Sequence, residues 1–338
     1  MNQQPFISIC IANYNGMSVI DDCIQSILQQ ISGLEIEILV HDDASTDESV
    51  AHIRKFYPDI QLLESDKNVG FCIANNRMAS IARGEYLLLL NNDAALYPDA
   101  LITLHRAAVE IGRPAILGLP QYKFDTGELL DIGSLFDPFL NPVPNKNSQR
   151  GDVAMVMGAC LWIPKVLWDE IGGFPEWFHT LTEDMYLCFV ALVYGYNVNV
   201  LNTSGFKHWV GKSLGGGKVK RGKLETTYKR RRMSERNKTF VMLLCLPSIM
   251  LAAILPIHLV LLLFEGILLS IIKRDKEIWS SIYSYTFESM WVERKRLLRE
   301  RKRIQNRRSI RYREILSIFI WYPYKLKMLV AHGLPNLQ

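Results

Sequence analysis

The chain has 338 residues, of which 49% are hydrophobic and 22% are charged, and its formal net charge is +5. This length and composition predict a large core in one domain of ordinary size plus an appendage, and they exclude a chain too small to bury a core. Residues 1–206 contain 11 Lys and Arg against 25 Asp and Glu, whereas residues 207–338 contain 28 against 9. This asymmetry predicts an anionic partner, either nucleic acid or an anionic membrane, for the second half only.

The six cysteines lie far apart, and no two of them have the C-x-x-C spacing. This spacing favours buried, reduced thiols over a disulfide framework or a zinc site, so we expect the catalytic part to lie in the cytosol. The polar start and the short apolar run after it, which Asn13 and Asn15 interrupt, predict no signal peptide.

Strands and helices are predicted to alternate along the first third of the chain. Apolar runs predict strands at 6–12, 36–40, 60–64 and 86–90, and amphipathic segments predict helices at 17–30, 46–56, 71–82 and 98–111. The alternation predicts an α/β fold, with a Rossmann-like, mostly parallel sheet and helices on both faces. Ligands of such sheets bind beyond the carboxyl ends of the strands.

The middle of the chain is less regular. Residues 123–152 are rich in Gly, Pro, Asn and Asp, which predicts a long loop that covers the ligand site at the strand ends or contacts an acceptor substrate. An apolar segment follows at 153–163, a helix is predicted to start near Thr182 with Thr182 as its N-cap, and a short strand is predicted at 197–201.

The tail is both apolar and basic. Residues 239–264 contain no Asp, Glu, Lys or Arg, and a membrane crossing needs roughly 20 such residues. Basic residues flank both ends of the run, and Pro247 and Pro256 interrupt it, so we predict a re-entrant hairpin or two interfacial helices rather than a single span. Residues 291–313 predict a basic interfacial helix, with a solvated charged helix as the alternative. We therefore expect a catalytic domain at 1–225 and a membrane-associated helical region at 226–338.

Acidic side chains follow two of the predicted strands. Asp42 comes just after the strand at 36–40, where a carboxylate can accept a hydrogen bond from a pyrimidine N–H; Ser45, Thr46 and Asp47 after it are interpreted as turn and cap residues. Asp93 follows four leucines and two asparagines. One such carboxylate, together with substrate phosphates, can hold Mg²⁺ or Mn²⁺, and the cation would stabilise a leaving diphosphate.

Two further candidates lie downstream. Glu183 and Asp184 open a predicted helix, where the helix dipole favours carboxylates in any case, but the same position also suits a general base. Asp184 is the expected base, with Glu183 in support. His208 precedes a glycine-rich stretch; it is either structural or a metal ligand beside a loop that closes over phosphates.

Together these residues resemble glycosyltransferase family 2, of the GT-A fold, and particularly its bacterial rhamnosyltransferase-like members. The resemblance covers about residues 6–240. The residues that carry it are Ile11 to Gly16, Asp42 to Asp47, Asn68-Val69-Gly70-Phe71, Asn75-Asn76, Leu90 to Ala94, Gly172-Gly173-Phe174, Glu183-Asp184 and His208 to Ser213.

The resemblance implies a role for each matching residue. Asp42 would contact the base, Ala12, Asn13, Tyr14, Asn15, Asn75 and Asn92 would line the nucleotide site, and Asp93 would be the D-x-D metal ligand, with His208 as a further ligand. Asp184 would be the base of a direct, inverting displacement. The family's D-x-D is Asn91-Asn92-Asp93 here, which leaves one metal carboxylate, and its Glu-Asp-x-Asp is Glu183-Asp184-Met185-Tyr186. The Q-x-x-R-W signature of processive synthases is absent, which predicts transfer of one sugar per encounter.

The leading hypothesis is an inverting, metal-dependent hexosyltransferase at the cytoplasmic face of the cell membrane, attached peripherally or by a re-entrant segment. It would move a sugar, with rhamnose as a candidate, from a nucleoside-diphosphate sugar to a lipid-linked saccharide in surface polysaccharide synthesis. A sugar-phosphate nucleotidyltransferase is an alternative, but Asn13 to Ser18 contains no Lys or Arg for a triphosphate. A non-enzymatic nucleic-acid binder is the other alternative, and the long uncharged run fits it poorly.

Overall fold

The computed structural model describes residues 6–31, 33–209, 218–220 and 223–337, and the chain divides into two compact units. The N-terminal unit comprises Met1–Ser134, Pro144–Leu192 and Tyr196–Ser213, and the C-terminal unit comprises Leu135–Val143, Val193–Gly195 and Leu214–Gln338. Each unit is continuous in space but not in sequence. Short segments of the middle of the chain therefore belong to the C-terminal unit.

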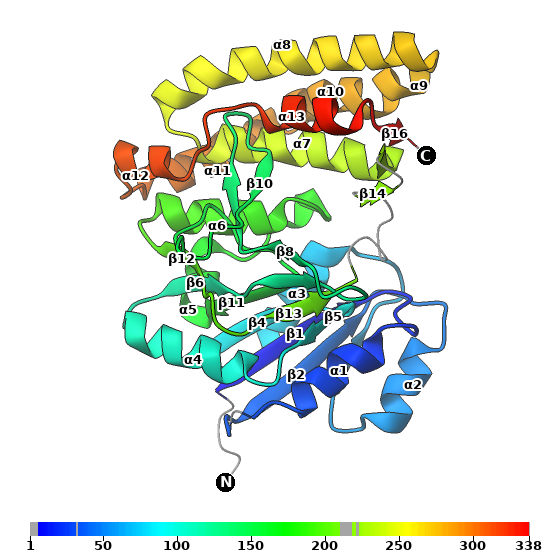
Figure 1. The fold of residues 1–338 in the computed structure, drawn as a ribbon, viewed down its shortest axis with the longest axis vertical. Coiled ribbons are helices and arrows are strands. Elements are labelled where there is room, and N and C mark those ends of the chain that lie inside the picture. The colour runs from blue at the N-terminus through cyan, green and yellow to red at the C-terminus, as the bar shows by residue number, and fades with distance from the viewer. Residues whose placement is uncertain (1–5, 32, 210–217, 221–222, 338) are drawn as a thin grey trace. The chain divides into compact units, whose positions relative to one another are not determined.

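The N-terminal unit is built on a sheet of seven strands (Figure 1). The strands, in their order across the sheet, are β12 (Asn197–Val200), β6 (Ala115–Gly118), β11 (Cys160–Pro164), β4 (Tyr86–Asn91), β1 (Ile7–Asn13), β2 (Ile36–Asp42) and β3 (Gln61–Glu64). All neighbouring pairs are parallel except those of β11, which is antiparallel to β4 and β6. The predicted mostly parallel α/β sheet is confirmed.

Helices follow the strands as the periodicity predicts. They are α1 (Ile20–Leu28), α2 (Ser49–Phe56), α3 (Phe71–Ile81), α4 (Ala100–Ile111), α5 (Lys165–Ile171), the short 3₁₀ helix η1 (Glu176–Phe178) and α6 (Glu183–Val193). Helices α1 and α2 each begin three residues later than predicted. Residues before α1 form a turn in which Val19 N–H bonds to the Gly16 carbonyl, and Asp47 accepts the Ser49 N–H at the start of α2. In both places a turn replaces the first predicted helical residues.

A second sheet brings distant segments of the N-terminal unit together. Its strands, in order, are β5 (Ala94–Leu96), β13 (Phe206–His208), β7 (Gln121–Lys123) and β8 (Leu129–Asp131). The prediction of one long loop at 123–152 is wrong, because this segment contains β8 and the hairpin of β9 (Ser134–Phe136) and β10 (Pro142–Pro144). Backbone groups inside the segment therefore have partners that composition alone does not reveal.

The C-terminal unit is mainly helical (Figure 1). Its helices are α7 (Tyr228–Cys245), α8 (Ser248–Lys273), α9 (Lys276–Ile278), the π-helix η2 (Trp279–Ser284), α10 (Tyr285–Val292), α11 (Arg294–Asn306), α12 (Tyr312–Ser317) and α13 (Tyr324–His332). A small sheet joins β14 (Lys218–Lys220), β15 (Lys223–Thr226) and β16 (Asn336–Leu337). From the middle of the chain, Asp137 accepts the backbone N–H of Tyr324 at 2.8 Å, which fixes the 135–143 segment within this unit.

The uncharged run at 239–264 lies in two helices. Its first part is buried in α7, and after a break at Leu246 and Pro247 the rest lies in α8. Pro256 does not interrupt the run as predicted, because α8 continues through it. Among the described residues α8 is the one helix long and apolar enough to cross a membrane, by length and composition alone.

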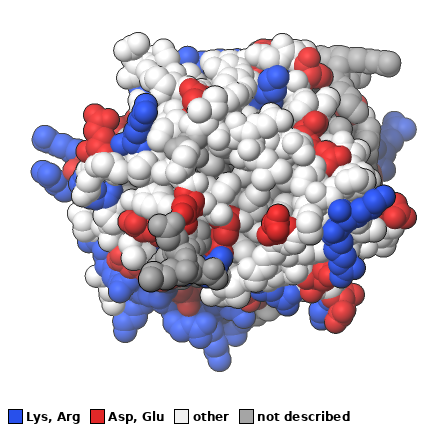
Figure 2. Space-filling view, turned by 90° about the horizontal axis from the view of Figure 1, so that it is seen from below, with Lys and Arg blue, Asp and Glu red and all other residues white. Residues whose placement is uncertain are grey.

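The sequence makes predictions about both the charge of the molecule and its cysteines. The face in Figure 2 carries side chains of both signs, with acidic groups scattered over its middle and most basic groups toward its edges, so no single sign of charge dominates there. All six cysteines are free and buried, as predicted. Burial raises the pKa of the Cys160 thiol to about 12, which keeps this thiol protonated and unreactive at neutral pH.

The basic helix α11 caps the end of α7. The Arg301 guanidinium donates to the carbonyls of Leu243 at 2.6 Å and Leu246 at 2.8 Å, and the Gln305 amide donates to the carbonyls of Leu244 and Cys245. The last carbonyls of a helix have no partner within the helix, and burying them unpaired is costly. Part of the predicted basic interfacial helix therefore caps another helix of the same unit.

Replacing Arg301 by Ala is expected to lower the free energy of unfolding by about 2 kcal/mol, because buried carbonyls of α7 would lose their donors. The neighbouring Lys302→Ala is the control; its side chain is exposed, so a change within about 0.5 kcal/mol is expected. Chemical denaturation of the two variants measures the difference. Equal stabilities would show that Arg301 does not cap α7.

Candidate functional site

The ends of three adjacent strands place polar side chains at one edge of the large sheet. In the register of β1 with β2, Asn13 lies opposite Asp42, and in the register of β1 with β4, Ala12 lies opposite Asn91. Because these strands are parallel neighbours, their carboxyl ends meet. The sequence prediction that the chemistry converges at the strand ends therefore has a geometric basis.

The side chain of Asn13 is the hub of this edge. Its Nδ2 donates to Asp42 Oδ2 at 2.8 Å and to Ser49 Oγ at 3.0 Å, and its Oδ1 accepts from Asn92 Nδ2 at 2.8 Å. Gly16 lies against the pair: a Cβ there would be 2.0 Å from Asn13 Oδ1 and 2.4 Å from Asn92 Nδ2. Only glycine fits this position without moving the hub.

Asp42 is buried and already accepts three hydrogen bonds. Its Oδ1 accepts the Ser45 N–H at 2.8 Å, while its Oδ2 accepts the Ser45 hydroxyl at 2.6 Å and the Asn13 amide. A carboxylate offers about four acceptor positions, so one position on Oδ1 remains for a ligand N–H. Asp47 accepts from the N–H groups of Met17 and Ser49, in agreement with its interpretation as a cap residue.

The remaining predicted nucleotide-site residues differ in their environment. Tyr14 is 46% exposed, and Asn15, with φ 50°, accepts the Thr46 N–H through its side chain. Ala12 is partly exposed at the end of β1. Asn75 is buried and its amide donates to the Phe71 carbonyl, so this amide is used within its own helix. Its neighbour Asn76 instead exchanges two hydrogen bonds with the backbone of Phe174.

Asp93 and His208 meet although 115 residues separate them. The antiparallel pairing of β5 and β13 sets His208 opposite Ala94, and His208 Nε2 lies 3.0 Å from Asp93 Oδ1. The other oxygen, Asp93 Oδ2, is buried and has no hydrogen-bond partner among the described residues. An unpartnered buried carboxylate oxygen beside an imidazole fits a divalent cation that completes its ligand set from substrate phosphates and water. No group of three or more His, Cys, Asp or Glu gathers in the described part of the chain.

Sequence reasoning missed two side chains next to this pair. Gln121 on β7 places its Nε2 3.0 Å from His208 Nδ1, and it is buried. Asp131 lies opposite Gln121 in the pairing of β7 with β8. Burial raises the pKa of Asp131 to about 7, against the lowering effects of the Gly133 N–H and of His208. Only the register of the second sheet reveals these two residues, and no local motif marks them.

The predicted base Asp184 is held by two backbone N–H groups. Its Oδ2 accepts from Gly158 at 3.1 Å and its Oδ1 from Met185 at 2.7 Å. Gly158 precedes Ala159, whose carbonyl accepts the N–H of Asn91 at the end of β4. Asp184 is therefore tied through this segment to the same strand end that leads to Asp93. Glu183 is buried at the start of α6.

The approach to α6 differs from the predicted cap. Thr182 is predicted to be an N-cap, but its φ is 65° and its hydroxyl is buried with no hydrogen-bond partner in the described part of the chain. His179 and Leu181 also have positive φ values, 66° and 67°. Non-glycine residues with positive φ store backbone strain of the order of 1 kcal/mol or more each, and such strained residues cluster at functional sites. Val210 to Ser213, which belong to the predicted His208 motif, lie outside the described residues.

Similar solved structures share the fold. TarS of S. aureus, residues 1–349 in complex with UDP, has a TM-score of 0.52 and 16% identity, covering 74% of this chain and 70% of that one. GalNAc-T7 with UDP, GalNAc and Mn²⁺ has a TM-score of 0.53 and 14% identity, covering 72% and 48%. At these identities the likeness concerns the fold, which is the predicted GT-A-like α/β architecture.

Sequence similarity identifies the family. The model of glycosyl transferase family 2 matches residues 8–172, the segment that contains Asn13, Asp42 and Asp93. The hyaluronan synthase of Pasteurella multocida is 35% identical over 104 residues, which are 30% of this chain and 10% of that synthase. Residues 8–172 are therefore a glycosyltransferase family 2 domain, as the motifs predict. The aligned segment is a small part of that relative.

We expect Asp93→Ala to weaken Mn²⁺ binding by about 10-fold or more, because the buried carboxylate would no longer supply its unpartnered oxygen. Asp59→Ala, which removes an exposed carboxylate, is the matched control and is expected to leave the affinity unchanged. Titration of Mn²⁺ followed by electron paramagnetic resonance measures the affinity in the presence of a nucleoside diphosphate. Similar affinities for the two variants would contradict the assignment.

Asp131→Asn is expected to flatten the pH dependence of stability. A carboxyl group whose folded pKa is raised destabilises the fold as pH increases from about 4 to about 7, because the unfolded state releases its proton first. At pH 8 the variant should therefore be more stable than the parent, by up to about 4 kcal/mol, and at pH 4 the two should be similar. Denaturation at both pH values tests this, with Asp59→Asn as control.

Proposed function

We propose that this chain is an inverting glycosyltransferase that takes a sugar from a nucleoside-diphosphate sugar. The observation that carries the proposal is the assembly at one sheet edge of the Asn13–Asp42 hub and the Asp93–His208 pair. Asp184 is tied to the same strand end through Gly158. The transfer needs three parts: a group that binds the nucleobase, a group that binds the cation, and a general base for the acceptor hydroxyl.

The nucleotide would bind over the hub. The free acceptor position on Asp42 Oδ1 suits a pyrimidine N–H, and the exposed ring of Tyr14 lies one residue beyond Asn13. Ala12, Asn15, Asn75 and Asn92 complete the proposed lining. The hub is rigid, because each of its polar groups has a partner before a ligand arrives, so little ordering is needed on binding.

The cation would be held by Asp93 and His208. When bound, Mg²⁺ or Mn²⁺ would neutralise charge that develops on the leaving diphosphate. For Nε2 of His208 to act as a ligand, its proton must reside on Nδ1. Gln121 accommodates this tautomer: its Oε1 is buried and has no partner among the described residues, so a rotated amide can accept from Nδ1–H.

Asp184 would act as the general base. It would accept the proton of the acceptor hydroxyl while that oxygen forms a bond to the anomeric carbon and the bond from this carbon to the diphosphate breaks. Attack opposite the leaving group inverts the configuration. The hydrogen bonds from Gly158 and Met185 orient the carboxylate before the acceptor arrives.

The acceptor is proposed to be a lipid-linked saccharide at the cytoplasmic face of the membrane, with transfer of one sugar per encounter and rhamnose as a candidate sugar. Support comes from the C-terminal unit, where α8 exposes apolar side chains and Lys273, Arg274 and Lys276 are exposed near its end. Such a combination suits a membrane that bears anionic lipids and the diphosphate of an acceptor.

Asp184→Asn is expected to reduce nucleoside diphosphate release by about 100-fold or more, because the amide cannot accept the proton. The assay combines detergent-purified protein, Mn²⁺, a panel of UDP-, GDP- and dTDP-sugars and a lipid extract. Asp59→Asn is the control. Retained release in the Asp184 variant would remove its role as base, and the absence of turnover with every donor would contradict the proposed function.

A further inference from the structure

Helix α8 has two different faces. His258, Leu262, Gly266 and Leu269 are buried, and their spacing of three or four residues places them on one side. The opposite side carries an exposed stripe, which consists of Ile257, Leu261, Phe264, Leu268 and Ile271. These five residues are 47–67% exposed and recur with the same spacing. The stripe alone spans about 21 Å of helix.

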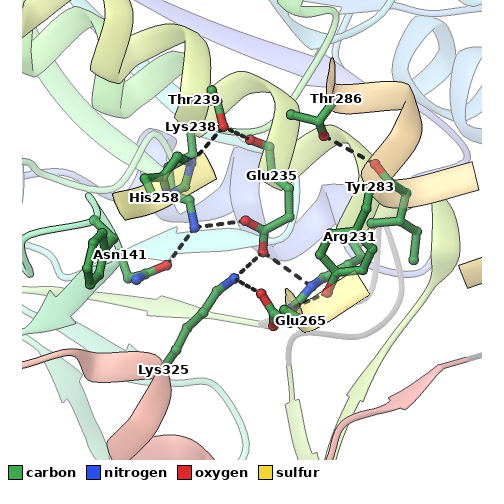
Figure 3. Close-up of polar contacts among 12 residues, drawn as sticks. Asn141, Arg231, Glu235, Lys238, Thr239, His258, Glu265, Tyr283, Thr286 and Lys325 are labelled. Carbon is green, nitrogen blue, oxygen red and sulfur yellow. Dashed lines mark hydrogen bonds and ion pairs between the residues drawn. The ribbon is translucent and has the colours of Figure 1, made fainter. Parts of the chain in front are cut away.

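The buried face of α8 joins a network of charges (Figure 3). Glu265 pairs with Arg231 of α7 and, at 2.9 Å, with Lys325 of α13. Lys325 also lies 2.6 Å from Glu235, which pairs with Arg231 and with Lys238. Three cations and two carboxylates thus share one buried region. Burial lowers the pKa of Lys238 to about 8, although Glu235 opposes this shift.

A second polar contact fixes α8 further along its length. His258 Nε2 lies 2.9 Å from the hydroxyl of Thr239, and the Lys238 ammonium donates to Asn141 Oδ1 at 2.8 Å (Figure 3). His258 and Glu265 are seven residues apart in the interior of α8, so the two polar contacts are separated by about 10 Å along the axis. The charged part of α7 therefore lies alongside the middle of α8.

This packing disfavours a crossing of the bilayer by α8. If α8 crossed, Arg231, Glu235 and Lys238 would lie at the depth of its middle, where charged side chains are expensive. The exposed stripe, by contrast, contains no charged residue. The one carboxylate in the helix, Glu265, is held on the inner side by Arg231 and Lys325. The charges thus favour contact of one face of α8 with lipid.

We propose that α8 lies in the plane of an anionic bilayer surface, with its exposed stripe among the acyl chains and its inner face still packed on α7. This inference deepens the membrane association of the proposed function and rests on it. The occupant of the stripe is lipid, because the stripe is uniformly apolar and because the segment at its C-terminal end has an excess of basic over acidic residues, Lys273, Arg274 and Lys276 against Asp275 and Glu277, which suits anionic headgroups.

The orientation can be tested with single added cysteines at the two ends of α8. Ser248 and Lys273 are exposed, whereas the six native cysteines are buried and give the background in the parent chain. Each variant, Ser248→Cys and Lys273→Cys, is expressed in bacteria and treated with a membrane-impermeant maleimide in inside-out vesicles and in spheroplasts. Modification of both in inside-out vesicles and of neither in spheroplasts is expected. Modification of the two ends from opposite sides would overturn the in-plane placement.

The occupant can be tested with Phe264 at the centre of the stripe. Phe264→Glu is expected to weaken binding to vesicles of phosphatidylglycerol and phosphatidylcholine by about 10-fold or more, because a large apolar side chain leaves the lipid. Val166→Glu, on α5 of the N-terminal unit, replaces another exposed apolar residue and should leave binding unchanged. A second copy of the chain could instead cover the stripe. In that case Phe264→Cys would form cross-linked pairs in lipid-free protein and would be protected there from labelling, and the inference would be wrong.

Failure of this inference can be separated from failure of the proposed function. If the parent chain binds vesicles but the two ends of α8 lie on opposite sides of the membrane, only the in-plane placement is wrong. If the parent chain does not bind vesicles, the proposed membrane association is wrong as well. Donor turnover in detergent reports on the transferase independently of both results, because the proposed sugar-transfer residues all belong to the N-terminal unit.

Discussion

The parallel alignment of β1 between β2 and β4 is the constraint on which the site depends. It places Asn13 next to Asp42 and brings the Asn92 amide within hydrogen-bond distance of the side-chain oxygen of Asn13. The amide of asparagine is suited to this position, because it offers donors to one neighbour and an acceptor to another. A carboxylate at residue 13 would face the carboxylate of Asp42. An apolar residue would remove one of the three hydrogen bonds that Asp42 accepts and the acceptor of the Asn92 amide.

The second sheet adds what the first cannot supply. Parallel strand ends provide carboxylates and amides from the first third of the chain, whereas β13 returns an imidazole from residue 208 to Asp93. The two sheets thus combine a nucleotide-facing edge with a cation-binding pair. A displacement of one residue in the pairing of β13 with β5 would turn His208 to the opposite face and separate the pair.

Much of the fold was predictable because local patterns of apolar residues in the sequence determine the strands and helices. Strands β1 and β4 are buried and mostly apolar on both faces, and α1 repeats apolar residues at helical spacing. Asp42 and Asp93 could be identified because each ends an apolar strand. Gln121 and Asp131 could not, because their importance arises from strand pairing across long separations. The same applies to the segment at 135–143, whose partners lie in the C-terminal unit, and to Thr182, whose backbone conformation excludes the cap its side chain suggests.

The capping of α7 by α11 has a practical consequence for how membrane attachment is studied. Removing the C-terminal helices would also remove the Arg301 and Gln305 donors, and it would take away Lys325, the cation shared by Glu235 and Glu265. A truncated chain would therefore expose uncapped carbonyls and two carboxylates that have each lost one cationic partner, together with the apolar interior of α7. Its behaviour on fractionation would report on misfolding as much as on lipid contact. Single substitutions in the exposed stripe of α8 leave these supports in place, which makes the lipid-facing surface separable from the scaffold that presents it.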